Sequence, residues 1–272
     1  LAAQVRSQRE EGTGRGLKFV LLRIVAALGY PFVDRRLRVE PFPVQLRRRL
    51  ERLGPTYIKL GQILSLREDL LPKTITAELK HLLNRLPVVP LSVLARIIES
   101  DLKRSIDDMF LQIDPIPLGS ASIGQTHRAT TQAGEPVILK VVKPGIRETL
   151  ERDAKLLRML GSILQVLIPR FQPRQLVNEF CDYTLREIDL RREADNAETF
   201  AANFADVPDV AFPEIHREFS GRSVLCMEFF DGLSPDSAEA RELPEEQRRH
   251  LTDLGAAAII RMLYRDGFFH AD

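Results

Sequence analysis

Cysteine, histidine and net charge are all scarce in this sequence. Its 272 residues include two cysteines, Cys181 and Cys226, too few for a disulfide framework, so we expect a reducing compartment. The five histidines show no metal-ligand spacing. A net charge of +1 gives the whole chain no strong attraction to polyanions, and we expect no nucleic-acid partner.

Long hydrophobic runs are also missing. Residues 17–30 (LKFVLLRIVAALGY) come nearest, but Lys18 and Arg23 interrupt them and they fall short of the ~20 apolar residues that cross a membrane. They predict a core-facing helix or an amphipathic helix on a membrane. The first 60 residues carry 13 Lys/Arg and 5 Asp/Glu. Such a basic region suits a membrane surface, a nucleic acid or an acidic partner, and is also typical of solvated helix faces.

A hydrophobic content of 44% is enough for one large domain or two small ones. Helical periodicity with Gly and Pro punctuation predicts that residues 1–104 are helical throughout. One helix is expected to end at Gly54, and the next to run from Pro55 to Pro72. Two more follow, one stopping before Pro87 and one at 91–102 with its apolar residues on one face.

Short β-rich runs begin near residue 110. They predict three strands at about 110–117, 123–131 and 135–143, with TQAGE as the hairpin turn between the last two. A helix at 147–168 and further helix from Pro173 to about 203 should follow. Two strands at 210–217 and 222–229, joined by REFSGR, and a helix from Pro244 to Gly267 complete the expected elements. The pattern predicts an α+β fold.

A lysine lies within the apolar run VILKVVKPGI, residues 137–146. The run reads as a buried strand, where an unpaired ammonium group costs several kcal/mol. Either Lys140 reaches water from an edge strand, or an anion binds it. Kinase-like folds place V-A-I-K where this chain has V-I-L-K, and there the lysine contacts the α/β-phosphates and is held by a glutamate on a helix.

The loop before this strand suits phosphate binding, because small residues allow backbone N–H groups to approach a phosphate closely. An ordinary hairpin loop is the alternative, since the sequence is neither G-x-G-x-x-G nor a Walker sequence. The candidate nucleotide loop comprises Gly119, Ser120, Ala121, Ser122, Ile123 and Gly124.

Carboxylates that could hold Lys140 occur in LREIDLRREADNAETF, on one expected helix. Glu187 and Glu193 are six residues apart, about 240° around a helix, so they cannot serve the same purpose. One could hold Lys140, while Glu187 and Asp189 face a metal or another cation. A solvated helix surface is the alternative.

Two further segments match parts of a kinase. In SVLCMEFFDG, a hydrophobic strand leads into Met227, Glu228 and Phe229, as in a hinge whose backbone reads adenine. In GFFHAD, Asp272 follows an aromatic pair and a histidine, as in the H-R-D catalytic loop. Each motif alone is ambiguous, and their order along the chain is what favours a kinase-like fold.

With these motifs, the chain resembles the UbiB family of atypical protein-kinase-like proteins, which is associated with ubiquinone biosynthesis. YIKLGQILSLREDLLP carries the family's K-x-G-Q signature at Lys59, Gly61 and Gln62. EIDLRREA carries its E-x-D motif at Glu187 and Asp189. PLGSASIGQTHRA looks like its alanine-rich nucleotide loop, and FFHAD like the start of its HADPHPGN loop. The resemblance covers about residues 50–272.

The resemblance implies a role for each matched residue and ATP with Mg²⁺ as cofactors. Lys140 would bind the α/β-phosphates, paired with Glu193, and Asp272 would be the catalytic aspartate. Loop 119–124 would cover the phosphates, and residues 227–229 would hold adenine. The K-x-G-Q helices would cover the site where a protein kinase admits its peptide. This implies ATPase or small-molecule kinase activity.

The resemblance also implies a regulatory contact. We expect Lys59 to point toward Glu187 and Asp189.

The resemblance implies a protein-kinase-like N-lobe and a truncated C-lobe. We expect four regions: a basic helical region at 1–50, a K-x-G-Q extension at 51–104, an N-lobe at 105–229 with a helical insertion at about 145–183, and the start of a C-lobe at 230–272.

The chain departs from the family pattern in three ways. Gly119 and Ser120 replace alanines usual in the loop, and 53 residues separate Lys140 from Glu193. The chain begins with Leu1 and stops at Asp272, so we expect a fragment whose Mg²⁺ ligands lie beyond it and which does not turn over ATP.

Three functions are compatible with these motifs. The first is an ATPase or kinase-like enzyme on the cytoplasmic side of a membrane, which supports ubiquinone or isoprenoid-lipid biosynthesis and contacts nucleotide, a membrane surface or prenyl lipid, and quinone-biosynthesis proteins. The second is a pseudokinase-like scaffold or lipid chaperone that uses nucleotide as a switch. The third, an aminoglycoside-type kinase, has no reason to carry the K-x-G-Q helices.

Overall fold

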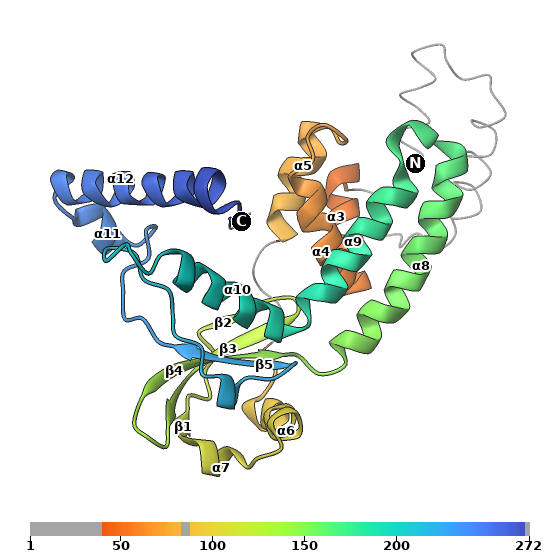
Figure 1. Ribbon diagram of the computed structural model, residues 1–272. Coiled ribbons are helices and arrows are strands. Elements are labelled where there is room, and N and C mark those ends of the chain that lie inside the picture. Colours follow the sequence, from red (N-terminus) through yellow and green to blue (C-terminus); the bar gives the residue numbers. More distant parts are fainter. Residues whose placement is uncertain (1–39, 83–87, 270–272) are drawn as a thin grey trace. The chain divides into compact units, whose positions relative to one another are not determined.

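The computed structural model describes residues 40–82 and 88–269 (Figure 1). The chain divides into two compact units. The helical unit contains the described residues up to 82 together with 145–185, and the sheet unit contains 88–144 together with 186–269. Asp272 lies outside the described residues, as does the apolar segment 17–30, and both keep their status as predictions.

The helical unit is built from helices that Gly and Pro delimit. Gly54, with φ of 103°, separates the first two helices. Pro72 and Gly145 are the N-cap residues of the helices that begin at Lys73 and Ile146, and Pro173 opens the last helix. The elements are α3 (Phe42–Leu53), α4 (Pro55–Ser65), α5 (Lys73–Leu79), the 3₁₀ turn η3 (Lys80–Leu82), α8 (Ile146–Leu167), the 3₁₀ turn η4 (Pro169–Phe171) and α9 (Pro173–Glu187).

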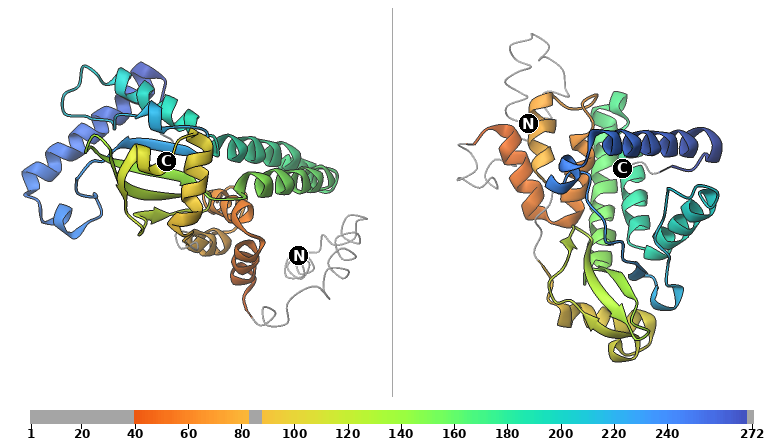
Figure 2. Two further views of the ribbon diagram at one scale, coloured as in Figure 1. Left: turned by 90° about the horizontal axis from the view of Figure 1, so that it is seen from below. Right: turned by 90° about the vertical axis from the view of Figure 1, so that its left-hand side faces the viewer.

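The core of the helical unit joins the K-x-G-Q helix to the later helical insertion. Helices α8 and α9 lie side by side as an antiparallel hairpin (Figures 1 and 2), and Gly161 lets α8 approach Val177 of α9 closely. The hairpin packs against α4, and Thr56 donates a buried 2.7 Å hydrogen bond to Asp153. Buried side chains of this core are Ala154, Leu157, Phe180 and Cys181, with Tyr57, Leu60 and Ile63 of α4 packed against them.

Gly61, the glycine of the K-x-G-Q signature, is required by packing. A Cβ atom at this position would lie 2.2 Å from Cδ1 of Leu82 and 2.9 Å from Cδ1 of Leu50, and both leucines are buried. We expect Gly61→Ala to destabilise the helical unit by about 1–3 kcal/mol, because the two leucines must repack. Thermal unfolding measures the effect.

Gly255 provides the matched control for Gly61, because it also lies within a helix. A Cβ there meets nothing within 4 Å, so Gly255→Ala should be neutral or stabilising by up to ~1 kcal/mol. A Gly61→Ala protein as stable as Gly255→Ala would contradict the packing argument.

The sheet unit contains an antiparallel five-stranded sheet in the order β1-β3-β4-β5, with β2 paired to β3. Its antiparallel sheet and its helices confirm the expected α+β class. The strands are β1 (Phe110–Ile113), β2 (Gly119–Ser120), β3 (Gly124–Thr131), β4 (Pro136–Val142) and β5 (Val224–Glu228). The helical elements are α6 (Leu91–Leu102), α7 (Ile106–Met109), α10 (Leu190–Asn203), η5 (Arg217–Phe219), α11 (Ala238–Glu242), α12 (Glu245–Arg261) and the π-helix η6 (Met262–Asp266).

The two faces of the sheet have different coverings. On one face, α6 packs on β4 and β5 and buries Leu94 and Ile98 against Leu139 and Val141. Helix α10 packs against β5 and lies on the opposite side of the sheet from α6 (Figure 1). Because side chains alternate along a strand, residue 140 projects toward the α10 side.

A buried glutamine fixes the entry to α6. The side-chain amide of Gln125 on β3 donates to the carbonyl of Val89 and accepts from its N–H, both at 2.9 Å. The Gln125 amide also lies 2.8 Å from Nε2 of His127, whose Nδ1 lies 2.7 Å from the carbonyl of Asp114. Since the amide nitrogen must donate, His127 accepts at Nε2 and donates from Nδ1. Both side chains are almost fully buried.

Two expected strands differ from the structure. The strand at 110–117 ends at Ile113, because Pro115 and Pro117 have no N–H to donate. The strand at 210–217 was wrong. That segment, which contains Pro213, forms a single bridge between Ile215 and Met227 and then the turn η5.

Two expected helices also end early. The helix expected to reach Pro72 stops at Ser65, and the turns that follow it hold an ion pair between Arg67 and Asp69. The helix expected from Pro173 to about 203 is interrupted between α9 and α10. Ile188 is fully buried there, and the N–H of Leu190 donates to the carbonyl of Arg222 rather than continuing α9.

Candidate functional site

Lys140 and Glu193 form an ion pair within the sheet unit. Lys140 lies on β4 opposite Thr126 of β3 and Leu225 of β5, so it is on an inner strand and not at an edge. Its Nζ lies 2.7 Å from both carboxylate oxygens of Glu193. The lysine side chain is 34% exposed and the glutamate 42%. The strand is therefore buried on one face only, and the ammonium lies on the other face with a partner that water also reaches.

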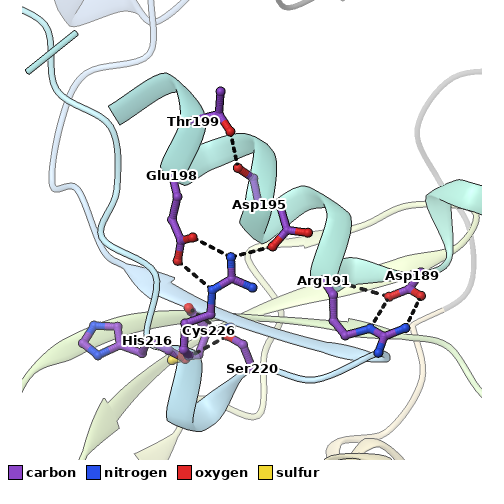
Figure 3. Close-up of polar contacts among 9 residues, drawn as sticks. Asp189, Arg191, Asp195, Glu198, Thr199, His216, Ser220 and Cys226 are labelled. Carbon is purple, nitrogen blue, oxygen red and sulfur yellow. Dashed lines mark hydrogen bonds and ion pairs between the residues drawn. The ribbon is translucent and has the colours of Figure 1, made fainter. Parts of the chain in front are cut away.

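The helix that carries Glu193 is held at its N-terminus and near its middle. Asp189 is the N-cap of α10 and accepts from the backbone N–H of Arg191. Further along, Arg217 of η5 contacts Glu198 and Asp195, each at 2.6 Å (Figure 3). These contacts hold α10 beside the β5 edge, which keeps Glu193 within reach of Lys140.

The candidate nucleotide loop is a tight turn between β2 and β3. The N–H of Ala121 donates to the carbonyl of Gly124 at 2.9 Å. A Cβ at Gly124 would lie 3.2 Å from the backbone oxygen of Val141, whereas nothing lies within 4 Å of one at Gly119. Ser122 and Ile123 complete the turn. Close packing against β4 thus explains why residue 124 is a glycine. No such contact requires a glycine at position 119.

Two polar groups at this loop bear on ligand binding. The hydroxyl oxygen of Ser120 is buried and has no hydrogen-bond partner among the described residues. A buried polar atom without a partner is costly, and a ligand oxygen would satisfy it. Lys143 is also buried, and its ammonium donates to the carbonyl of Ala121 at 2.8 Å. Burial lowers the pKa of Lys143.

The expected hinge residues lie at the end of β5. Met227 and Glu228 are its last residues, and Phe229 follows with its ring 4.3 Å from the guanidinium carbon of Arg128. The N–H of Glu228 donates to the carbonyl of Glu214, and that of Phe229 to the carbonyl of Pro136. These two N–H groups are therefore already engaged. Phe230 is the first residue after β5 whose N–H donates to none of the described residues.

Sequence reasoning missed three residues near the site. The sequence shows where the hydrophobic strand ends but not which backbone N–H groups are already bonded, so it does not point to Phe230. Lys143 stands three residues after Lys140 in the same apolar run, and this second lysine in an apolar run was the available signal. Gln125, which anchors α6, had no signal beyond being a polar residue in a strand.

The motif residues of the helical unit all lie on or beside α4. The Nζ of Lys59 lies 5.7 Å from the ring centroid of Tyr183, and the side-chain amide of Gln62 donates to the carbonyl of Leu82 at 3.3 Å. The expected contact of Lys59 with Glu187 and Asp189 relates the two units to each other and stays a prediction. Glu187 is the last residue of α9.

Glu187 and Glu193 lie on different helices, α9 and α10, which corrects the sequence interpretation. Asp189 adopts φ −105° and ψ 92° at the N-cap of α10, so the expected 240° rotation between Glu187 and Glu193 does not apply. The Asp189 carboxylate contacts Arg191 at 2.6 and 2.9 Å (Figure 3). It also lies 3.8 Å from Arg222. It is therefore paired with arginines in the sheet unit.

The charge on Asp189 should make stability depend on pH. Hydrogen bonds from Arg191 lower the pKa of Asp189 below 3.8, against the opposing effect of burial. The folded protein therefore binds this proton less tightly than the unfolded chain, so the carboxylate stabilises the fold above pH 3.8 and this contribution is lost as the pH falls through the lowered pKa. We expect Asp189→Asn to remove this pH dependence, measured by urea unfolding from about pH 6 to about pH 3.

Asparagine and alanine separate the two roles of Asp189. Asparagine is as good an N-cap as aspartate, whereas alanine is not, so Asp189→Ala should cost about 1 kcal/mol more than Asp189→Asn. Equal stabilities of the two variants would contradict a capping role.

No metal-binding cluster is found in the part of the chain that the structure describes. Across 40–82 and 88–269, no group of three or more His, Cys, Asp or Glu side chains could hold a metal ion. Over the same ranges, no helix combines the length and the apolar character that crossing a membrane requires.

Comparison with known proteins identifies the family. The ABC1 atypical kinase-like domain matches residues 81–272. The Probable protein kinase UbiB of Marinobacter nauticus is 36% identical over 231 residues, which are 84% of this chain and 42% of that protein. The protein ACTIVITY OF BC1 COMPLEX KINASE 8, chloroplastic, of Arabidopsis thaliana is 34% identical over 232 residues, 84% of this chain and 30% of that protein.

A solved structure is similar to this chain in sequence and fold. The complex of Rv3197 with erythromycin from Mycobacterium tuberculosis is 29% identical, with a TM-score of 0.58 over 75% of this chain and 52% of that one. The chain spans less than half the length of the two curated relatives. The family match and the kinase-like sheet with its lysine–glutamate pair together mean that the chain belongs to the ABC1 (UbiB) family of atypical kinase-like proteins.

Proposed function

We propose that the sheet unit is the nucleotide-binding lobe of an atypical kinase or ATPase. The observation that carries the proposal is the ion pair between Lys140 and Glu193, at 2.7 Å from both carboxylate oxygens. An ammonium group held by one carboxylate and partly open to water can also bind phosphate oxygens. In this proposal Lys140 binds the α/β-phosphates, and Glu193 fixes its position.

The loop at 119–124 fits the same ligand. The buried Ser120 hydroxyl lacks a partner among the described residues, and a phosphate oxygen would provide one. Lys143 stabilises the loop by donating a hydrogen bond to the carbonyl of Ala121. These residues would bind and orient the phosphates of ATP.

Adenine would bind at the end of β5. Since the N–H groups of Glu228 and Phe229 are engaged within the chain, we propose that the N–H of Phe230 donates to the base, beside Met227. Asp272 would hold the attacking hydroxyl or water as catalytic aspartate. Mg²⁺ bound with ATP would neutralise the phosphates, and we assign it no ligand in this chain.

The wider role follows from the family. We propose that the whole protein supports ubiquinone or isoprenoid-lipid biosynthesis on the cytoplasmic side of a membrane, together with quinone-biosynthesis proteins, because its relatives include a UbiB protein. The K-x-G-Q helices would cover the nucleotide site and exclude a peptide substrate. The contact of Lys59 with the E-x-D carboxylates belongs to this proposal.

Direct binding of ATP and ADP tests the nucleotide proposal. Thermal-shift and calorimetric measurements on the chain, with and without Mg²⁺, should detect binding. An absence of binding under both conditions would overturn the enzyme proposal and favour a pseudokinase-like scaffold that works without a nucleotide switch.

A further inference from the structure

The distal half of the α8–α9 hairpin has an unusual surface. Helix α8 buries one face against α4 and α9, through residues such as Ala154, Leu157 and Gly161. A second apolar stripe runs along another face of the same helix, at the i, i+3, i+4 and i+7 spacing of one helix face. This stripe consists of Leu156, Met159, Leu160, Ile163 and Val166.

The stripe continues around the tip of the hairpin. Ile168 and Phe171 follow it in the connection between the helices, and all seven side chains are between 39 and 75% exposed. Scattered apolar residues on a surface are ordinary, but a continuous row of them marks an interaction site.

The charged residues within this segment of the sequence have one sign. Between Ala154 and Asn178 there are four basic residues and no acidic residue. Lys155 lies beside the stripe on α8, whereas Arg158 of the same helix pairs with Asp182 outside this segment. Arg170 and Arg174 flank Phe171 at the tip, so the most apolar end of the hairpin is also basic.

We propose that this surface, the hairpin surface (residues 155–174), lies on an anionic lipid membrane. Apolar side chains inserted below the headgroups, with Lys and Arg among the headgroups, are the composition of an interfacial helix. Each basic residue near an anionic surface adds to the attraction. The surface of an ordinary protein partner carries charges of both signs. A site for such a partner would have no reason to lack acidic residues over this length of sequence. The inference deepens the membrane part of the proposed function and rests on it.

Vesicle binding by the full chain tests the proposal. We expect it to bind vesicles of phosphatidylcholine and phosphatidylglycerol more tightly than vesicles of phosphatidylcholine alone, and less tightly as salt is raised. The double variant Ile163→Glu/Val166→Glu should lower the partition coefficient about tenfold or more, as should Arg170→Glu/Arg174→Glu. All four positions are exposed, so both variants should fold, which circular dichroism checks.

Leu251→Glu is the matched control, because Leu251 is on α12 and is 56% exposed, close to the 52% of Ile163. It should bind vesicles as the unmodified chain does. Hairpin variants that bind like the unmodified chain would overturn the proposal and place membrane binding elsewhere. The proposal would also be overturned if the chain does not bind vesicles but self-associates through this surface. Light scattering would then show a dimer that is lost in the hairpin variants.

Nucleotide affinity, measured on the same samples, separates this inference from the enzyme proposal. The hairpin variants should bind ATP with unchanged affinity. Lost vesicle binding with intact nucleotide binding would support the hairpin surface specifically. A fall in both for the hairpin variants would indicate a damaged fold and overturn the assignment.

Discussion

Replacing Lys140 with alanine is expected to weaken ATP binding by about 10- to 100-fold. Hydrogen bonds to charged groups contribute about 1.5–3 kcal/mol, and each 1.4 kcal/mol is a factor of ten in Kd. The variant also leaves Glu193 facing the phosphates without its counter-charge, which adds repulsion between like charges. Isothermal titration calorimetry with ATP and ADP measures the change.

Two variants complete this test. Glu193→Gln should weaken binding less than Lys140→Ala, because the ammonium remains and loses only its charged partner. Lys155→Ala removes an exposed lysine from the helical unit and should leave nucleotide affinity unchanged. If Lys140→Ala binds ATP as tightly as Lys155→Ala does, the phosphate role of Lys140 is wrong.

Replacing Gln125 with alanine is expected to destabilise the sheet unit by about 3 kcal/mol or more. The change removes hydrogen bonds to both backbone groups of Val89 and to the ring of His127. Each buried polar group left without a partner costs about 1–3 kcal/mol. The variant also creates a cavity, because Gln125 is fully buried. Urea unfolding of the purified chain measures the loss.

Gln112→Ala provides the control for this prediction. Gln112 lies on the same sheet, but it is exposed and bonds only to the side chain of Asp114. Its replacement should change stability by less than about 0.5 kcal/mol. Similar effects at the two positions would mean that the Gln125 network does not anchor α6.

Much of the fold was available from local sequence patterns. Strands β3 and β4 and helices α6 and α8 lie within two residues of their expected bounds, because strong apolar periodicity and a turn at each end define them. The family was also predicted, and the match to residues 81–272 confirms it. The expected pairing of Lys140 with Glu193 came from the resemblance, since no local pattern links residues 53 apart.

The sequence by itself determined the α+β class, the family, and which residue types line the candidate site. Only the tertiary structure decided which face of β4 carries Lys140 and where the helix after Pro173 breaks. Asp189 leaves the helix because burial of Ile188 and the hydrogen bond from Leu190 to Arg222 outweigh one continued helical turn. The hinge amides are engaged because Glu214 and Pro136 lie beside β5. These outcomes depend on contacts between distant residues, which local propensity does not encode.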